Sequence, residues 1–282
     1  MTFPDAAAIA ERRARFRALH ESGCFIIPNP WDVGSTLYLA STGFKAVAST
    51  SSGYAWSRGQ QDSTLTLDET LAHLRQLVAA SDLPVNADFV DGFGATPDEV
   101  AASVSRAIET GVAGLSIEDS YSAPSEREKH SEPLRPIAEG VERVAAARQA
   151  IDKSGMDVLL VGRAENFIVG RPNIDDTIAR LKAYSAAGAD CLYAPGISAP
   201  EHITAVVAAV APKPVNLLVG GTSDFNLKDI EKMGVRRVSI GGGLARVAWG
   251  ATMRAATLLA EGNFSGMEGA TSGDVLNKIM RG

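Results

Sequence analysis

Eight short apolar segments, separated by longer Ala-rich amphipathic stretches, constrain the fold of this chain more than any other feature. Each segment is nearly free of charge, as expected of strands buried on both faces, and each precedes polar, Gly or Pro residues. This alternation is typical of βα units on a parallel sheet. The predicted strands are Cys24–Ile27, Ala46–Thr50, Val85–Phe89, Gly114–Ile117, Val158–Val161, Cys191–Ala194, Val215–Val219 and Val238–Gly241.

Eight such units, spaced by roughly 20 to 40 residues, predict an α/β fold of the (β/α)8 or TIM-barrel type. Gly111, Gly188 and Gly234 each lie just before a strand, where a helix commonly ends in glycine. An open, doubly wound sheet is the competing architecture, but no G-x-G-x-x-G motif opens any of its possible first turns. The 282 residues suit one barrel with a few extra helices, so we expect a single domain over 1–282.

Two helical stretches lie outside the predicted barrel. Residues 1–20 predict an N-terminal helix rich in Ala and Arg, and residues 244–281 predict two or more helices broken near Gly262 and Gly273. Surplus helices often carry subunit contacts, so we expect the C-terminal extension at an interface of a homo-oligomer. Residues 121–139 form the one long polar connection after a strand, and they are a candidate lid.

Composition excludes several classes of partner. The formal net charge of -6, without a run of Lys and Arg, argues against nucleic acid. Cys24 and Cys191 lie in apolar surroundings typical of reduced core thiols, which favours a cytoplasmic protein. Residues 1–17 lack the apolar core of a secretory signal, and no apolar run is long enough to cross a membrane.

Acidic residues follow neighbouring predicted strands. Asp88 ends the third strand, Glu118 follows the fourth, and Asp62 lies in the connection after the second. Because active sites of such barrels form at the carboxyl ends of the strands, we expect these oxygens to share one rim, where they suit Mg²⁺ or Mn²⁺. One direct carboxylate would suffice, with the others acting through water. Asp91 and Asp119 fit this site or helix caps and turns equally well.

An arginine and a small-residue segment complete the predicted rim. Arg163 follows the fifth strand, where its guanidinium can bind a carboxylate or phosphonate, or instead form a salt bridge with Glu165 or Glu118. The second strand runs into the segment 50–54, Thr-Ser-Ser-Gly-Tyr, whose backbone amides and hydroxyls can bind an anionic oxygen.

Five motifs occur in order along the chain: Asn29-Pro30-Trp31-Asp32, Ser51-Ser52-Gly53, Asp88 with Gly92-Phe93-Gly94, Ile117-Glu118-Asp119 and Arg163-Ala164-Glu165. Taken together, these motifs resemble the isocitrate lyase/phosphoenolpyruvate mutase superfamily, over a stretch from about Phe25 to Val219. The resemblance implies a barrel whose last helix is swapped between subunits, usually in a tetramer, with Mg²⁺ and an α-oxycarboxylate substrate. Members cleave or form C–C or P–C bonds through an enolate stabilised by the metal.

The resemblance also implies roles for individual residues. Asp88 would bind the metal directly, while Asp62 and Glu118 would act through metal-bound water. The far pole of the substrate would bind to Arg163, which together with Glu118 is expected to take part in catalysis. The residues expected to hold the substrate carboxylate are Ser52, Gly53 and Tyr54.

Three departures from the family pattern bear on the reaction. The second acid of the metal-site run is replaced by Val90, with Asp91 one step further, where strand alternation turns it to the other face. The K-[KR]-C-G-H loop that carries the proton-donating Cys of the lyases is absent; the corresponding loop 125–131 offers Glu126, Lys129 or His130 as a substitute acid. The Lys-Thr-Asn-Ser-type loop and the sixth-strand His of the phosphonate enzymes are also absent, and residues 193–196 read Tyr-Ala-Pro-Gly.

Three functional hypotheses remain after these departures. The leading one is a metal-dependent carbon–carbon lyase or decarboxylase of a compact 2-oxo or 2-hydroxy acid, such as oxaloacetate or a substituted malate. The second is a phosphonate P–C mutase or hydrolase. The third is a keto-acid-binding homologue without turnover. Fold membership alone does not choose among them.

Overall fold

The computed structural model describes residues 2–281, and the strands in this range form one parallel sheet. Their order is β1-β8-β7-β6-β5-β4-β3-β2, and the Ala48 amide donates to the Pro28 carbonyl at 3.0 Å, which joins the two end strands. The predicted (β/α)8 barrel is therefore confirmed; the two ends of the predicted domain, residues 1 and 282, lie outside the described range. The strands are β1 Phe25–Ile27, β2 Val47–Ala48, β3 Val85–Asp88, β4 Gly114–Glu118, β5 Leu159–Arg163, β6 Cys191–Tyr193, β7 Val215–Leu218 and β8 Arg237–Ser239.

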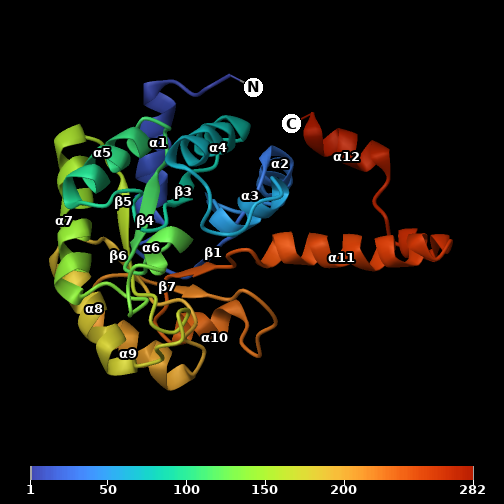
Figure 1. Ribbon diagram of the computed structural model, residues 1–282. Coiled ribbons are helices and arrows are strands. Elements are labelled where there is room, and N and C mark those ends of the chain that lie inside the picture. The colour runs from blue at the N-terminus through green and yellow to red at the C-terminus, as the bar shows by residue number, and fades with distance from the viewer. Residues whose placement is uncertain (1, 282) are drawn as a thin grey trace.

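Helices surround the barrel, as Figure 1 shows, and several begin at a capping box. Thr66 and Thr96 each accept a hydrogen bond from the amide three residues later, which fixes the starts of α4 and α5 beside the site. The helices are α1 Ala6–Ala18, α2 Val33–Ser41, α3 Ser51–Ser57, α4 Leu67–Ala80, α5 Pro97–Ile108, α6 Pro124–Arg127, α7 Ile137–Ser154, α8 Ile174–Ala186, α9 Pro200–Val210, α10 Leu227–Lys232, α11 Gly243–Ala260 and α12 Gly273–Met280, with a 3-10 turn at Phe264–Met267.

Strand alternation divides the apolar side chains into two layers. In β5, Leu160 packs outward with the helices, whereas Leu159 and Val161 pack inside the barrel. Phe16 of α1 belongs to the inner layer, so the predicted N-terminal helix closes the amino-terminal end of the barrel. The open end for a substrate is therefore the carboxyl end of the strands.

Strand boundaries differ from the prediction where a charged or capping residue lies at an end. The eighth strand begins at Arg237, whose buried side chain donates to Asn216 Oδ1 at 2.8 Å inside the barrel. The fifth strand extends to Arg163 for the same reason: the charge has partners on neighbouring strands. The second strand stops at Ala48 because Thr50 is the N-cap of α3.

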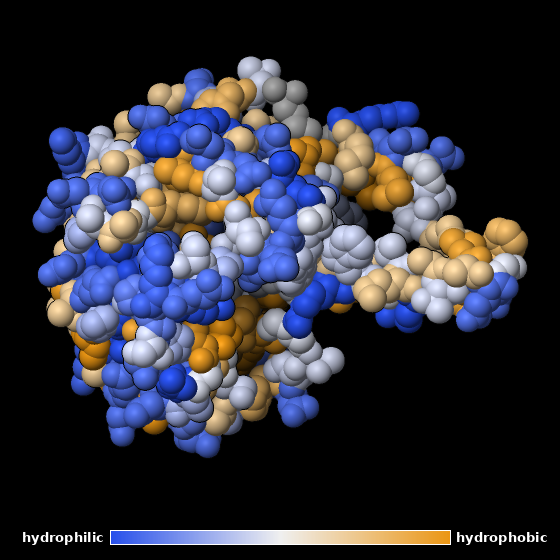
Figure 2. Space-filling model, in the orientation of Figure 1, coloured by the Kyte–Doolittle hydropathy of each residue, from blue (hydrophilic) through white to orange (hydrophobic). Residues whose placement is uncertain are grey.

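The C-terminal extension forms an arm that projects away from the barrel (Figure 1). In α11 only Ala245 is buried, while Val247 and Met253 are 67% and 64% exposed. Apolar side chains gather along this arm in Figure 2. The chain turns at Gly262, with φ of 76°, and α12 then returns to pack on α2. The predicted helical extension is confirmed, and no helix within residues 2–281 is long and apolar enough to cross a membrane.

Candidate active site

Strand register brings the predicted acids and arginine to one rim. Asp88 of β3 pairs with Ser116 of β4, and Glu118 of β4 pairs with Arg163 of β5. Asp88 is fixed from the neighbouring strand end, because its amide donates to Ser49 Oγ at 2.8 Å. Alternation along each strand points these ends into the barrel mouth.

Arg163 lies at the centre of this rim. Its Nη1 is 3.0 Å from Asp88 Oδ1 and 3.1 Å from Glu118 Oε2, and its Nε donates to Glu165 Oε1 at 2.5 Å. The guanidinium also lies over the Tyr193 ring, 5.2 Å from its centroid. The salt bridges expected with Glu118 and Glu165 are thus both present, while Nη2 makes no hydrogen bond to any residue of the described range.

Acids outnumber cations at this rim, and burial makes the imbalance costly. Burial raises the pKa of Glu118, although Arg163 opposes the shift, and it raises the pKa of Glu165 to about 8. Loss of surrounding water, followed by the charge of Asp88, raises the pKa of Asp62. A cation placed among these carboxylates would relieve their repulsion, so the donor set fits a divalent metal.

The carboxylates are arranged for few direct metal contacts. Asp62 and Asp88 approach the same Ser51 hydroxyl, at 3.4 and 2.9 Å, and Glu118 shares Arg163 Nη1 with Asp88. Within residues 2–281, no group of three or more His, Cys, Asp and Glu side chains is close enough to hold an ion by itself. This arrangement suits Mg²⁺, which often binds one or two carboxylates and retains several waters.

Ser51, in the segment after β2, positions Asp88. The Ser51 amide and hydroxyl both donate to Asp88 Oδ2 at 2.9 Å, a role that the sequence did not reveal. Ser52 Oγ lies 3.1 Å from Thr50 Oγ1, at the edge of the mouth. Gly53 is required by packing: a Cβ there would lie 2.7 Å from Thr50 Cγ2. Tyr54 stacks on His73.

Two further acids have structural partners. Val90 has φ of 40°, an unusual value for a β-branched residue, and the turn directs Asp91 away from the mouth to Arg135, 3.0 Å away. Asp119 is buried; it accepts hydrogen bonds from the Tyr184 hydroxyl at 2.7 Å and from the Glu165 amide at 2.9 Å. Both acids therefore hold loops in place, and neither joins Asp88.

The connection 121–139 contains the short helix α6 and folds back through a bridge between Ser120 and Leu134. His130 is exposed and stacks on Tyr121, with ring centroids 3.7 Å apart. Its imidazole makes no hydrogen bond within the described part of the chain. The alternative acids Glu126 and Lys129 are paired with each other at 2.6 Å. None of the three touches Asp88 or Arg163 here.

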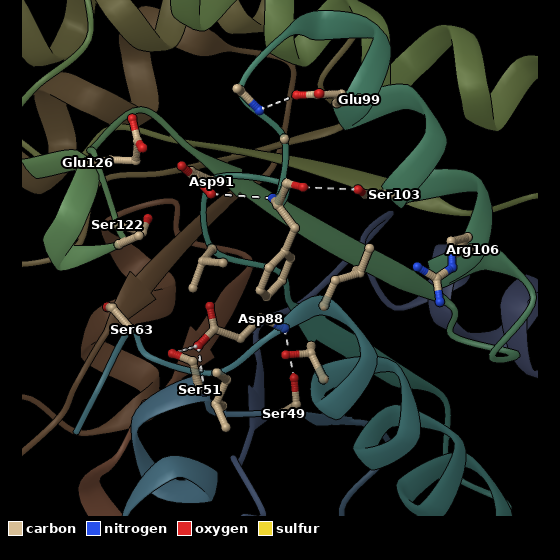
Figure 3. Close-up of a pocket in the computed structure, with 18 of the residues that line it drawn as sticks. Ser49, Ser51, Ser63, Asp88, Asp91, Glu99, Ser103, Arg106, Ser122 and Glu126 are labelled. Carbon is tan, nitrogen blue, oxygen red and sulfur yellow. Dashed lines mark hydrogen bonds between the residues drawn. The ribbon is translucent and has the colours of Figure 1, made fainter. Parts of the chain in front are cut away.

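Two cavities meet at Asp88 and Ser51. The first, of about 240 Å³, occupies the barrel mouth and is lined by Ser52, Asp62, Arg163 and residues of the inner strand faces. The second, of about 700 Å³, lies beside it between α4, α5 and the connection 121–139 (Figure 3). The first cavity has the volume of a compact molecule, and the second adjoins it at Asp88.

An α/β barrel whose carboxyl rim gathers acids around one arginine defines a class of enzyme that handles small anionic substrates. Residues 16–260 match the family model described as phosphoenolpyruvate phosphomutase. The chain belongs to this family, within the phosphoenolpyruvate mutase/isocitrate lyase superfamily. The resemblance derived from the sequence motifs is confirmed.

Three relatives illustrate the range of activities. The structure of a putative lyase/mutase from Burkholderia cenocepacia J2315 superposes with a TM-score of 0.91, at 44% identity over 98% of both chains. The 2-methylisocitrate lyase of Bacillus subtilis is 27% identical over 81% of this chain and 75% of that enzyme. An oxaloacetate decarboxylase of a Bradyrhizobium species is 31% identical over 62% of this chain and 58% of that enzyme. These relatives confirm that the chain belongs to a superfamily of enzymes. Because their activities differ, they do not identify its reaction.

Proposed function

We propose that this protein is a Mg²⁺-dependent lyase or decarboxylase of a 2-oxo or 2-hydroxy (di)carboxylic acid. The observation that carries the proposal is the position of Arg163 among Asp88, Glu118 and Glu165 at a barrel-mouth cavity of about 240 Å³. Family membership and the oxaloacetate- and methylisocitrate-cleaving relatives support this class of reaction.

Asp88 would bind Mg²⁺ or Mn²⁺ directly, with Asp62 and Glu118 acting through water. When bound, the ion would stabilise negative charge that develops on the substrate oxygens as the C–C bond breaks. Asp88 is already oriented by two donors from Ser51, which limits the cost of arranging the site.

The chain's own residues would bind and orient the acid. Arg163 would present its unused Nη2 to the far carboxylate, and the 52–54 segment, Ser-Gly-Tyr, would hold the near one. Glu118 is buried at this rim, 3.1 Å from Arg163, and it is our first candidate for the acid. His130 is the second candidate, and its use requires the connection 121–139 to move.

Phosphonate P–C chemistry is the second candidate function, supported by the family model itself. It is tested by following phosphonopyruvate with ³¹P NMR, where an unchanged spectrum eliminates it. A binder without turnover is distinguished by thermal stabilisation with 2-oxo acids and Mg²⁺ in the absence of product.

We further propose a cytoplasmic homo-oligomer, a dimer or a tetramer, in which the arm is exchanged between subunits. The free thiols of Cys24 and Cys191 support a reducing compartment. The exposed apolar face of α11 supports an interface between copies.

The Asp88→Ala variant tests the main proposal. Oxaloacetate and substituted malates are incubated with Mg²⁺, and release of pyruvate or another 2-oxo acid is measured. Wild type is expected to turn over at least one substrate, and the variant to lose at least about 100-fold in kcat. Asp32→Asn, at the exposed N-cap of α2, serves as the control. Full Mg²⁺-dependent turnover by Asp88→Ala would refute the proposal.

A further inference from the structure

Arg237 lies inside the barrel without an acidic partner. It is the first residue of β8 and is 3% exposed. Its Nε donates to Asn216 Oδ1 at 2.8 Å, and its Nη1 lies 3.3 Å from His20 Nε2 and 3.5 Å from Asn86 Oδ1. No Asp or Glu within residues 2–281 forms a salt bridge with this guanidinium. A buried charge normally has a counter-charge, because an unpaired one costs free energy.

The two arginines of the mouth cavity, the space of about 240 Å³ at the barrel mouth, differ in their surroundings. Arg163 contacts three carboxylates at the rim, whereas Arg237 contacts neutral groups. Arg237 also lies deeper, because it is at the amino end of its strand and contacts His20, just beyond the helix that closes that end of the barrel. The cavity is therefore acidic at its rim and basic at its floor, the part of the wall formed by Arg237, Asn216 and Asn86.

One continuous wall connects the rim to this floor. Successive register partners on β5, β6, β7 and β8 all line the mouth cavity: Arg163, Tyr193, Asn216 and Arg237. Arg237 Nη2 makes no hydrogen bond within residues 2–281, and it is not sealed from solvent. This N–H group is free to donate to an anion in the cavity.

The layer between the rim and the floor is polar. Barrels of this type usually fill their interior with Val, Ile and Leu side chains. Here the cavity wall instead includes Asn86, Ser116 and Ser239. Asn86 comes two residues before Asp88 on the same face of β3, so about 7 Å of strand separates the levels of the two side chains. A short diacid that binds at Asp88 can therefore reach the floor.

We infer that Arg237 binds a carboxylate of the substrate at the floor of the mouth cavity. This inference rests on the proposed function, because it places the 2-oxo or 2-hydroxy acid group at Asp88. The far carboxylate, oriented by Arg163 from the rim, takes its counter-charge from Arg237. An uncharged group in its place leaves the buried guanidinium unbalanced, so the floor selects a dicarboxylic acid over its amide. A free inorganic anion offers similar chemistry, and the experiment separates the two sources.

Binding of matched ligands tests the inference. Malate and 2-oxoglutarate are titrated in the presence of Mg²⁺, each against its ω-amide, and oxalate serves as a short probe of the rim alone. Wild type is expected to bind at least one diacid about tenfold or more tightly than its amide. In Arg237→Met this preference should fall to about twofold or less, while oxalate binding is unchanged.

Three variants serve as controls. Arg236→Met removes the neighbouring guanidinium, which donates to the Gly23 carbonyl at 2.6 Å and does not line the cavity, so it should keep the wild-type preference. Arg237→Lys retains the charge and should keep part of the preference. Arg237→Gln lacks the charge but can still donate to Asn216, so it decides the case if Arg237→Met fails to fold.

The outcomes distinguish this inference from the proposed function. Absence of oxalate binding in wild type overturns both. Oxalate binding without a preference for either diacid overturns the inference alone, and so does a preference that persists in Arg237→Met or Arg237→Gln, as expected if Arg163 held the far carboxylate by itself. Inorganic phosphate is titrated as well. A wild type that binds phosphate through Arg237 but does not distinguish diacid from amide assigns the floor to a free anion and overturns its assignment to the substrate.

Discussion

At the scale of single residues, the rim depends on one guanidinium that holds three carboxylates. The planar fork of Arg163 reaches Glu165 through Nε while Nη1 contacts Asp88 and Glu118. An ammonium group cannot span these positions. The acids are held by the same contacts that hold the arginine, so the cost of arranging the site is met during folding and not during turnover.

Replacement of Arg163 tests how far its positive charge stabilises the buried acids Glu118 and Glu165. Arg163→Met leaves Glu118 and Glu165 buried without a counter-charge, so the free energy of unfolding is expected to fall by about 3 to 5 kcal/mol at pH 8. The loss should be smaller at pH 5, because carboxyls with raised pKa values can become neutral. Urea unfolding without metal measures both values.

Arg163→Lys provides the matched control for this prediction. It keeps the positive charge, and its stability loss should be smaller than that of Arg163→Met, while turnover falls at least about 100-fold because the fork is lost. A loss below about 1 kcal/mol for Arg163→Met at both pH values would contradict a role of the guanidinium in holding buried acids.

At the scale of elements, α1 and the start of β8 share a polar contact beneath the inner apolar layer. His20 lies just after α1; its Nδ1 is 2.8 Å from the Phe16 carbonyl, and its Nε2 is 3.3 Å from Arg237 Nη1. The contact requires a neutral imidazole that accepts from the guanidinium at Nε2. Burial, then the Arg237 charge, lowers the pKa of His20 to about 3.

This contact predicts sensitivity to acid. Between pH 6.5 and about 3 the unfolded chain binds a proton at His20 that the folded chain does not, so stability falls as the pH falls through this window. From pH 7 to pH 5, wild type should lose about 2 kcal/mol more than His20→Gln, which cannot titrate. Chemical denaturation at the two pH values measures the difference. His130→Gln, which removes an exposed imidazole, should show the wild-type slope; an equal slope in His20→Gln would contradict the prediction.

The residues that share the carboxyl rim are predictable from the sequence, although the strand boundaries are not, because the βα alternation brings the carboxyl ends of all the strands to one edge. Asp88, Glu118 and Arg163 come together for that reason. Contacts across elements were not predictable: the donation from Ser51 to Asp88 depends on where α3 begins, and the partners of Arg237 include Asn216 of β7 and His20, two residues after α1. A charged residue in an apolar segment was assigned to the preceding loop, which misplaced the start of the eighth strand.

At the scale of the whole molecule, α11 is the part of the arm that is nearly unburied in one chain. A helix of 18 residues with one buried side chain does not stabilise the fold of its own subunit. Figure 2 shows apolar side chains exposed along the arm, among polar ones. Because burial of apolar area is the main stabilising term, this surface favours association with another copy of the chain.

Disruption of this surface should therefore change the assembly and leave the barrel intact. Wild type is expected to show a mass of two or four chains of 29.5 kDa by light scattering after size exclusion. The double change Trp249→Glu and Met253→Glu places charges where the side chains are 46% and 64% exposed, so a monomer can hydrate them whereas an apolar interface cannot. The variant should be monomeric with an unchanged far-UV spectrum, and Lys182→Glu, on the exposed face of α8, should keep the wild-type mass. A monomeric wild type would refute the exchanged arm. It would not affect the proposed acidic rim, because one chain builds that rim from β3, β4 and β5.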